Sequence, residues 1–181
     1  TARGWSAQLE IRHNEQVTAD LADRVLAVRG GVTAVSLDDE PDGFIDAVRD
    51  QALDLSDDHR QVQVRLVLGR ACRTVHRAVP HLVAALQLPY SASRGWSDFL
   101  EAMDDRAGTL REFVIVVDAA DLLRDEDLDA WRELVSSLSM PYMCLGGGWR
   151  TLVLVDSAVG WELSRFGSAA GAEAAAALRA A

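Results

Sequence analysis

The sequence predicts an α/β protein in which a small, mostly parallel β-sheet is packed by helices. Two observations lead to this fold class: strand-like and helix-like patterns alternate along the chain, and one strand-like segment is a near-continuous apolar run of the kind found in central strands. With 181 residues, of which 49% are hydrophobic, the chain is also long enough to bury a substantial core.

The first 60 residues contain a mixture of strand and helix patterns. Residues 6–13 alternate enough for a strand, whereas residues 15–28 have apolar side chains at helical spacing. Those side chains are Val17, Leu21, Val25 and Leu26. Residues 31–38 are rich in β-branched residues and follow two glycines, which predicts a strand after a turn. As an alternative, this strand pairs with residues 24–29 in a hairpin.

A second helix is predicted over residues 41–55, which begin with a proline, a residue favoured in a first helical turn. Its predicted buried face consists of Phe44, Ile45, Val48 and Leu53. The polar residues 56–61 form the best candidate linker. After this linker, residues 62–69 alternate strictly, with Val62, Val64, Leu66 and Leu68 on one face of a strand.

The next predicted helix, residues 72–88, contains Pro80. Proline breaks a helix interior but is tolerated in a first turn, so we expect the helix to begin between residues 75 and 79 or to kink there. Residues 88 and 89, Leu-Pro, end it. A short helix follows at residues 95–106, and the apolar run 112–118 predicts a central strand.

The remaining elements are a helix over residues 125–138 and a strand over residues 149–156. Asp125 suits the N-cap of that helix, with Glu126 and Asp127 in its first turn. Its predicted buried stripe is Leu128, Trp131, Leu134, Val135 and Leu138. The glycine-rich segment 145–150 is interpreted as a turn between elements rather than as a phosphate cradle, because no helix start follows it.

Charge and composition exclude several classes of function. The chain has 28 acidic and 18 basic residues, a net charge of −10, and every basic residue is arginine. Phosphate contacts need positive surface, so we expect no nucleic-acid binding, whereas a basic protein partner is compatible with this charge. No apolar run is long enough for a membrane span. Cys72 and Cys144 lack paired spacing, which indicates buried reduced thiols and a cytoplasmic protein.

The sequence does not assemble an active site, so we expect a non-enzyme without a cofactor. His76 and His81 fall on different helix faces, which makes them a poor metal pair, and we expect no metal site. "FVIVVDAADLL" (113–123) resembles the acidic strand end of a P-loop NTPase, but a chain without lysine lacks the phosphate-binding lysine of that motif. A degenerate, nucleotide-free version of such a fold stays as an alternative.

Residues 96–105 combine an apolar face with an acidic one. The apolar side chains at i, i+3, i+4 and i+7 are Trp96, Phe99, Leu100 and Met103, and we expect them to be buried. The carboxylates on the other side are Asp98, Glu101, Asp104 and Asp105. Like charges this close repel each other by a few tenths of a kcal/mol per pair. The cluster is either a solvated surface or a face that meets a partner.

From residue 62 onward, the order of elements resembles the barstar family of ribonuclease inhibitors. In that family the first helix ends in Leu-Pro, a tight loop rich in Tyr and Gly follows, and an acidic second helix comes next. Here "LQLPY" (86–90) ends the helix and residues 89–96 keep the spacing. "GWSDFLEAM" (95–103) overlays the second helix, with Glu101 at its last acidic position.

The resemblance continues to residue 156. Residues 113–138 look like the family's second strand, connecting segment and last helix, and residues 151–156 look like its third strand. The chain departs from the family at the loop and helix start, where it has Ser91, Ala92, Ser93, Gly95 and Ser97. The implied organisation is an N-terminal α/β extension or small domain (1–60), a barstar-like domain (61–157) and an Ala-rich tail (158–181).

The resemblance implies an inhibitor or immunity-type module that occludes the basic cleft of a ribonuclease or toxin. The implied partner-binding residues are Tyr90, Ser91, Ser93, Arg94, Gly95, Ser97, Asp98, Glu101, Asp105 and Glu126. The alternative is a non-catalytic α/β scaffold or regulatory domain in a larger assembly, with an acidic face that is only solvated.

Overall fold

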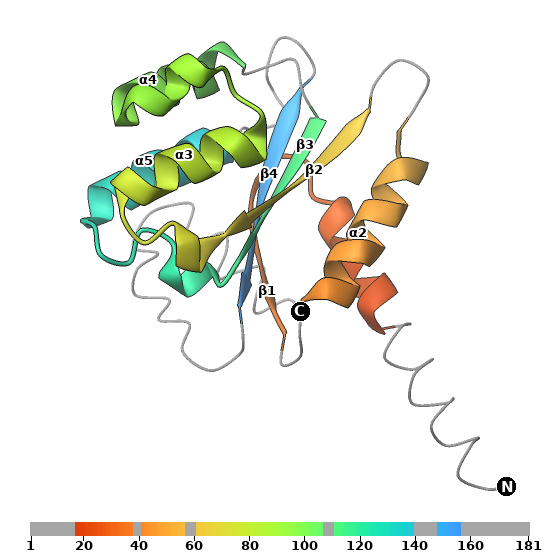
Figure 1. The fold of residues 1–181 in the computed structure, drawn as a ribbon. Helices are drawn as coiled ribbons and strands as arrows, with labels where there is room; N and C mark the ends of the chain where they lie inside the picture. Colours follow the sequence, from red (N-terminus) through yellow and green to blue (C-terminus); the bar gives the residue numbers. More distant parts are fainter. Residues whose placement is uncertain (1–16, 38–40, 57–60, 107–110, 140–147, 157–181) are drawn as a thin grey trace, which may run out of the picture.

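A four-stranded parallel β-sheet forms the centre of the computed structural model, which describes residues 17–37, 41–56, 61–106, 111–139 and 148–156 (Figure 1). Its strands are β1 (Gly31–Ser36), β2 (Val62–Leu68), β3 (Arg111–Val117) and β4 (Trp149–Asp156). They lie in the order β1-β4-β3-β2, and each neighbouring pair is parallel. The predicted α/β class with a small parallel sheet is therefore confirmed.

The strand β1 belongs to the same sheet, although it comes from the N-terminal part of the chain. All six of its residues pair with β4. Gly30 and Gly31 have φ values of 81° and 89°, a region in which residues with a side chain are strained, so glycine is needed where the chain turns from the helical residues 17–26 into β1. The alternative hairpin between residues 31–38 and 24–29 is wrong, because β1 has β4 as its partner and the hairpin's other arm is partly helical.

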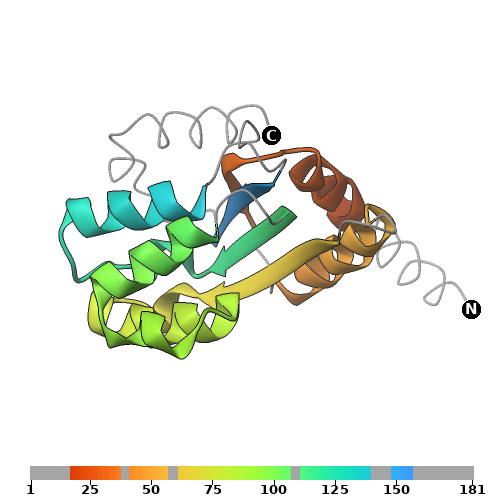
Figure 2. The ribbon, with the colours of Figure 1, turned by 90° about the horizontal axis from the view of Figure 1, so that it is seen from above.

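Helices cover both faces of the sheet (Figure 2). One face carries α3 (Val75–Leu86), α4 (Trp96–Asp105) and α5 (Leu128–Leu138), and the other carries α2 (Asp42–Asp54) and the helical residues 17–26. The side chains of β3 alternate between the two layers: Val114 and Val116 pack with the first layer, and Phe113, Ile115 and Val117 with the second. The apolar run therefore forms a strand buried on both faces, between β4 and β2, as predicted.

The helix α3 begins at Val75 and keeps Pro80 in its interior. The start lies within the predicted interval, and the proline ring is exposed, so it does not disturb the face packed on the sheet. The helix ends at Leu86, where Gln87 adopts a left-handed conformation with φ of 54°. Pro89 then follows, as the sequence predicts, and a proline there cannot continue a helix.

Three residues of the predicted buried helix faces are exposed: Val17, Leu53 and Leu128, with exposed fractions of 53%, 70% and 37%. Leu53 follows Ala52, which already points into the core, and one residue turns a helix by about 100°. Leu128 is the first residue of α5, whose buried face begins at Trp131. Likewise, the fully buried side chains of the helical residues 17–26 begin at Ala22.

The N-cap of α5 is Asp127, not Asp125 as predicted. The Asp127 Oδ1 atom accepts a hydrogen bond from the Ala130 N–H at 2.9 Å. Asp125 instead forms an ion pair with Arg73 at 3.0 Å. The N-cap is therefore two residues later than predicted, because Asp125 and Glu126 are bound to Arg73 and Val75 at the start of α3.

Several predicted features lie outside the described residues. They are the strand at 6–13, most of the linker at 56–61, the first half of the glycine-rich turn at 145–150, Cys144, and the tail at 158–181. The division of the chain at residues 60 and 157 stays a prediction. Within the described ranges, no helix has the length and apolarity needed to cross a bilayer.

Candidate functional site

Carboxylates stand at the carboxyl ends of the two central strands. Asp118 follows β3, and Asp156 is the last residue of β4. The Asp156 Oδ2 atom accepts a hydrogen bond from the Ala120 N–H at 2.7 Å, and the Asp118 Oδ2 atom lies 3.3 Å from the Nε of Arg70. Gly69 packs against this turn so closely that a Cβ there would lie 2.1 Å from the Asp118 carbonyl oxygen. These groups therefore hold the strand ends together.

This edge of the sheet is where open parallel sheets bind ligands, in the crevice outside the strand ends. A phosphate would need positive charge or free backbone N–H groups there. Here a carboxylate takes the N–H of Ala120, a second carboxylate stands beside it, and the chain contains no lysine. Within the described ranges, no cluster of three or more His, Cys, Asp or Glu residues could hold a metal ion. In the described part of this edge, the Ala120 N–H is therefore bound to Asp156, and the guanidinium of Arg70 is paired with Asp118.

The second candidate surface is formed by η2 (Tyr90–Arg94) and α4, which follow each other directly. Its inner side is apolar: Phe99 and Met103 are buried, and Trp96 packs partly against the same core. The rings of Trp96 and Phe99 stack with their centroids 5.6 Å apart. The Trp96 Nε1–H also donates a hydrogen bond to Glu133 on α5 at 2.8 Å. These contacts fix the orientation of α4. The predicted buried face is confirmed for Phe99 and Met103, whereas Trp96 and Leu100 are half-buried against the same core.

The outer side of this surface is acidic and exposed. All four carboxylates of α4, namely Asp98, Glu101, Asp104 and Asp105, are exposed, and the last turn of the helix contains no basic residue to balance them. Tyr90 is 86% exposed, the largest fraction among the exposed large apolar side chains of the described residues. The Ser93 Oγ–H donates to the Tyr90 carbonyl oxygen at 2.7 Å, which closes the turn of η2.

The structure gathers nine of the ten predicted partner-binding residues on η2 and α4 and the glycine between them. Seven are exposed and two are half-buried: Tyr90, Ser91, Arg94, Ser97, Asp98, Glu101 and Asp105, then Ser93 and Gly95. Glu126 has a different place, because its Oε1 atom accepts the Val75 N–H at 2.8 Å at the start of α3. Its contact with this N–H gives it a structural role that the sequence pattern did not predict.

Sequence reasoning also missed a buried ion cluster under α4 and α5. Glu112 is fully buried, and its carboxylate lies 2.8 Å from the Nε of Arg150, 3.2 Å from the Nε of Arg65 and 3.8 Å from the Nη2 of Arg106. Arg150 is itself 1% exposed, and its Nη1 donates to the Ser137 carbonyl oxygen at 2.8 Å. Sequence spacing carried no signal for this cluster, because Glu112 and Arg150 become direct neighbours only through the register of β3 and β4.

This cluster joins three strands to the helical layer above them. Arg106, which follows α4, also donates to the carbonyl oxygen of Leu86 at the end of α3. Burial lowers the pKa of the Arg106 guanidinium, and Arg65 and Arg150 add to this, whereas Glu112 opposes it. One carboxylate is therefore shared by three guanidinium groups, and the arrangement is a structural link between the sheet and the helices.

The remaining reactive side chains have structural environments. Burial raises the pKa of the Cys72 thiol to about 12, so the thiol is protonated at neutral pH and is a poor nucleophile. The His81 Nε2 atom accepts a hydrogen bond from the Leu68 N–H at 3.2 Å, while His76 is exposed. The two histidines lie on α3 in different environments, in agreement with their predicted placement on different helix faces.

No protein-family model matches the chain, and no curated protein matches it by sequence. Among solved structures, the chain is similar to the Aeropyrum pernix ORC2 protein in its ADPNP-ADP complexes, with a TM-score of 0.58 and 14% identity over 86% of this chain and 43% of that one. The ADP form of the same protein gives 0.58 and 13% over 82% and 42%. The chain spans less than half of that protein's length, and the similarity shows a shared fold.

Proposed function

We propose that the chain is a non-catalytic α/β domain that acts as a scaffold or regulatory module in a larger assembly, built on a degenerate NTPase-like fold. The similarity to a protein solved with ADPNP and ADP supports the relation to nucleotide-binding folds. The hydrogen bond from the Ala120 N–H to Asp156 carries the other half of the proposal, because it places a carboxylate at the sheet edge where a nucleotide phosphate would need a donor.

A direct titration with nucleotides tests this proposal. We expect no saturable heat when ADP or ATP with Mg²⁺ is titrated to about 1 mM in a calorimeter. A dissociation constant above about 1 mM corresponds to a binding free energy of less than about 4 kcal/mol. Asp156→Asn removes the negative charge but keeps an acceptor for the Ala120 N–H. The same nucleotide titration of this variant shows whether the charge alone prevents binding. Saturable binding of either nucleotide to the native chain would contradict a degenerate site.

A second candidate function is the barstar-class module, in which η2 and α4 occlude a basic ribonuclease or toxin cleft. One observation favours it: Asp98, Glu101 and Asp105 project into solvent beside the exposed Tyr90, while the apolar face of α4 is held rigidly by the core. A rigid acidic face suits steering of a basic partner. If Glu101 becomes a buried hot spot in the complex, Glu101→Ala weakens binding by about 2 kcal/mol or more.

One set of charge reversals separates the two functions. The variant Asp98→Arg/Glu101→Arg changes the acidic face of α4, and Asp46→Arg/Asp50→Arg, which reverses two exposed charges on α2, is the matched control. For a scaffold that leaves this face solvated, partners recovered from the native host remain bound to both variants. For a barstar-class module, the basic partner is lost only with the α4 reversals. Inhibition of the recovered protein's ribonuclease activity then identifies the second function.

A further inference from the structure

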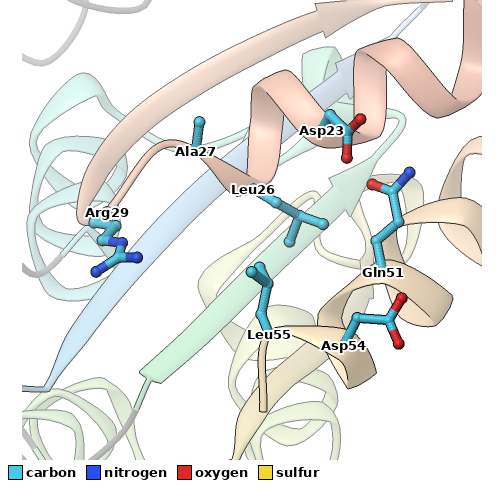
Figure 3. Close-up of a pocket in the computed structure, with 7 residues that line it drawn as sticks. All are labelled: Asp23, Leu26, Ala27, Arg29, Gln51, Asp54 and Leu55. Carbon is cyan, nitrogen blue, oxygen red and sulfur yellow. The ribbon is translucent and has the colours of Figure 1, made fainter. Parts of the chain in front are cut away.

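Two helices of the N-terminal part leave an open pocket of about 490 Å³ between their C-terminal ends (Figure 3). One is the helical segment 17–26, and the other is α2. The volume falls within the range of small-molecule sites in proteins, about 300 to 1,000 Å³. The pocket lies on the face of the sheet opposite to α4, so it is separate from both surfaces considered above.

The pocket has a strongly negative side. Asp23 and Asp54 line it, and each stands near the C-terminal end of its own helix. The helix dipole places partial negative charge at this end, so a carboxylate there is unfavourable, and the last turn of α2 has no basic residue. Neither aspartate takes part in an ion pair with another described residue. Two exposed carboxylates, one near the end of each helix, thus line one pocket.

Gln51 adds an oxygen acceptor between these carboxylates, as Figure 3 shows. Its Nε2 donates to the Ala19 carbonyl oxygen at 3.3 Å, and this contact orients the amide. The Oε1 atom is buried and has no hydrogen-bond partner among the described residues. A donor on a ligand would pair with this acceptor if the amide turned toward the pocket.

The other walls are apolar and basic. Leu26 is buried and Leu55 is 47% exposed, and both lie in the middle of the pocket in Figure 3. Arg29 lies on the opposite side of the pocket from the two aspartates, as Figure 3 shows. The lining therefore consists of an acidic side, an apolar centre and a guanidinium on the opposite side.

We propose that this pocket binds a small aliphatic molecule with a positively charged nitrogen on the acidic side that Asp23 and Asp54 form, and with its alkyl chain on Leu26 and Leu55. The guanidinium of Arg29 complements a carboxylate at the other end of such a ligand. A free basic amino acid has all three features, so L-lysine is the probe that matches the lining. This site does not depend on the function proposed above, because it concerns a different face of the sheet.

Titration of the isotope-labelled full chain with L-lysine, followed by amide chemical shifts, tests the site. We expect saturable shifts at residues 23–29 and 51–55. Asp23→Asn and Asp54→Asn each weaken binding about two- to fivefold, the effect of losing one partly exposed ion pair. Asp50→Asn is the matched control, since it makes the same change on an exposed position of α2 outside the pocket, and it leaves the affinity unchanged.

Two analogues separate the parts of the proposal. L-norleucine keeps the alkyl chain and the amino-acid group but lacks the terminal ammonium, and we expect it to bind more weakly than lysine. Cadaverine keeps both nitrogens but lacks the carboxylate, so it loses the contribution of Arg29. The proposal is overturned if no saturable shift appears up to about 20 mM lysine. It is equally overturned if norleucine matches lysine or if the double variant Asp23→Asn/Asp54→Asn binds like the native chain.

Discussion

The buried carboxylate of Glu112 allows a quantitative test of how the sheet is joined to its helical layer. We consider Glu112→Gln, which keeps the size of the side chain and removes its charge. The native carboxylate is 0% exposed and faces three guanidinium groups, the nearest being that of Arg150 at 2.8 Å. After the substitution, Arg150, Arg65 and Arg106 remain close together without a negative charge between them.

Removing one partner of a buried ion pair costs about 3–5 kcal/mol, because the remaining charge stays in a medium of low polarity. Arg150 is 1% exposed and cannot reach water without disturbing β4, so we expect Glu112→Gln to lose about 3 kcal/mol or more. Since domains of this kind are stable by about 5–15 kcal/mol, the variant remains folded but is strongly destabilised. The same change at the exposed Glu101 serves as the control and alters stability by less than about 0.5 kcal/mol.

Urea unfolding followed by circular dichroism measures these free energies. A double-mutant cycle adds Arg150→Met, which removes one guanidinium and leaves Glu112 paired with Arg65. We expect Arg150→Met to cost less than Glu112→Gln, and the double variant to cost less than the sum of the two by about 1 kcal/mol or more. The reasoning fails if Glu112→Gln loses less than about 1 kcal/mol, or if the two effects are additive.

Three further outcomes follow from single contacts. Gly69→Ala places a Cβ 2.1 Å from the Asp118 carbonyl oxygen, and because backbone cannot move aside cheaply we expect a loss of about 1–3 kcal/mol in urea unfolding; unchanged stability would contradict the close approach. Asp127→Ala removes the N-cap of α5 and costs about 1 kcal/mol, whereas Asp125→Ala removes an exposed ion pair and costs less. If thermal unfolding showed Asp125→Ala to be the more destabilising variant, Asp125 would be the N-cap, as the sequence predicted. Burial raises the pKa of the Cys72 thiol from its ordinary value of 9.0 to about 12, so the unfolded state loses this proton first as the pH rises. The free energy of unfolding therefore falls by about 1 kcal/mol per pH unit above pH 9. Urea unfolding at pH 8 and pH 10 should show a smaller fall for Cys72→Ala than for the native chain.

Local patterns predicted much of the secondary structure. Strict alternation placed Val62, Val64, Leu66 and Leu68 on one face of β2, and all four pack on the layer that contains α2. Helical spacing likewise identified the face of α4 that holds Phe99 and Met103 against the core. These patterns succeed because a periodic apolar stripe leaves one arrangement that buries it.

The sequence patterns could not predict which strands and side chains distant along the chain become neighbours. The partner of β1 could not be read from local spacing, because a strand pattern states which face is apolar but not which strand lies beside it. The cluster around Glu112 was missed for the same reason, since Glu112 and Arg150 become neighbours only in the observed register. Glu126 was assigned to the partner surface on proximity in sequence, yet its carboxylate accepts the N–H of Val75 at the start of α3. Whether η2 and α4 meet a partner stays a prediction.

The place of β4 between β1 and β3 has a consequence for the order of synthesis and folding. Among the described strands, β1 has β4 as its only neighbour in the sheet, and the Gly30 N–H that precedes it donates to Thr151 across 121 residues of sequence. At about 5–20 residues per second, the ribosome makes that partner on the order of ten seconds after β1 itself. During this interval, β1 cannot pair with β4, although α2 can already pack against β2. β1 is therefore expected to join the sheet only after β4 has been made.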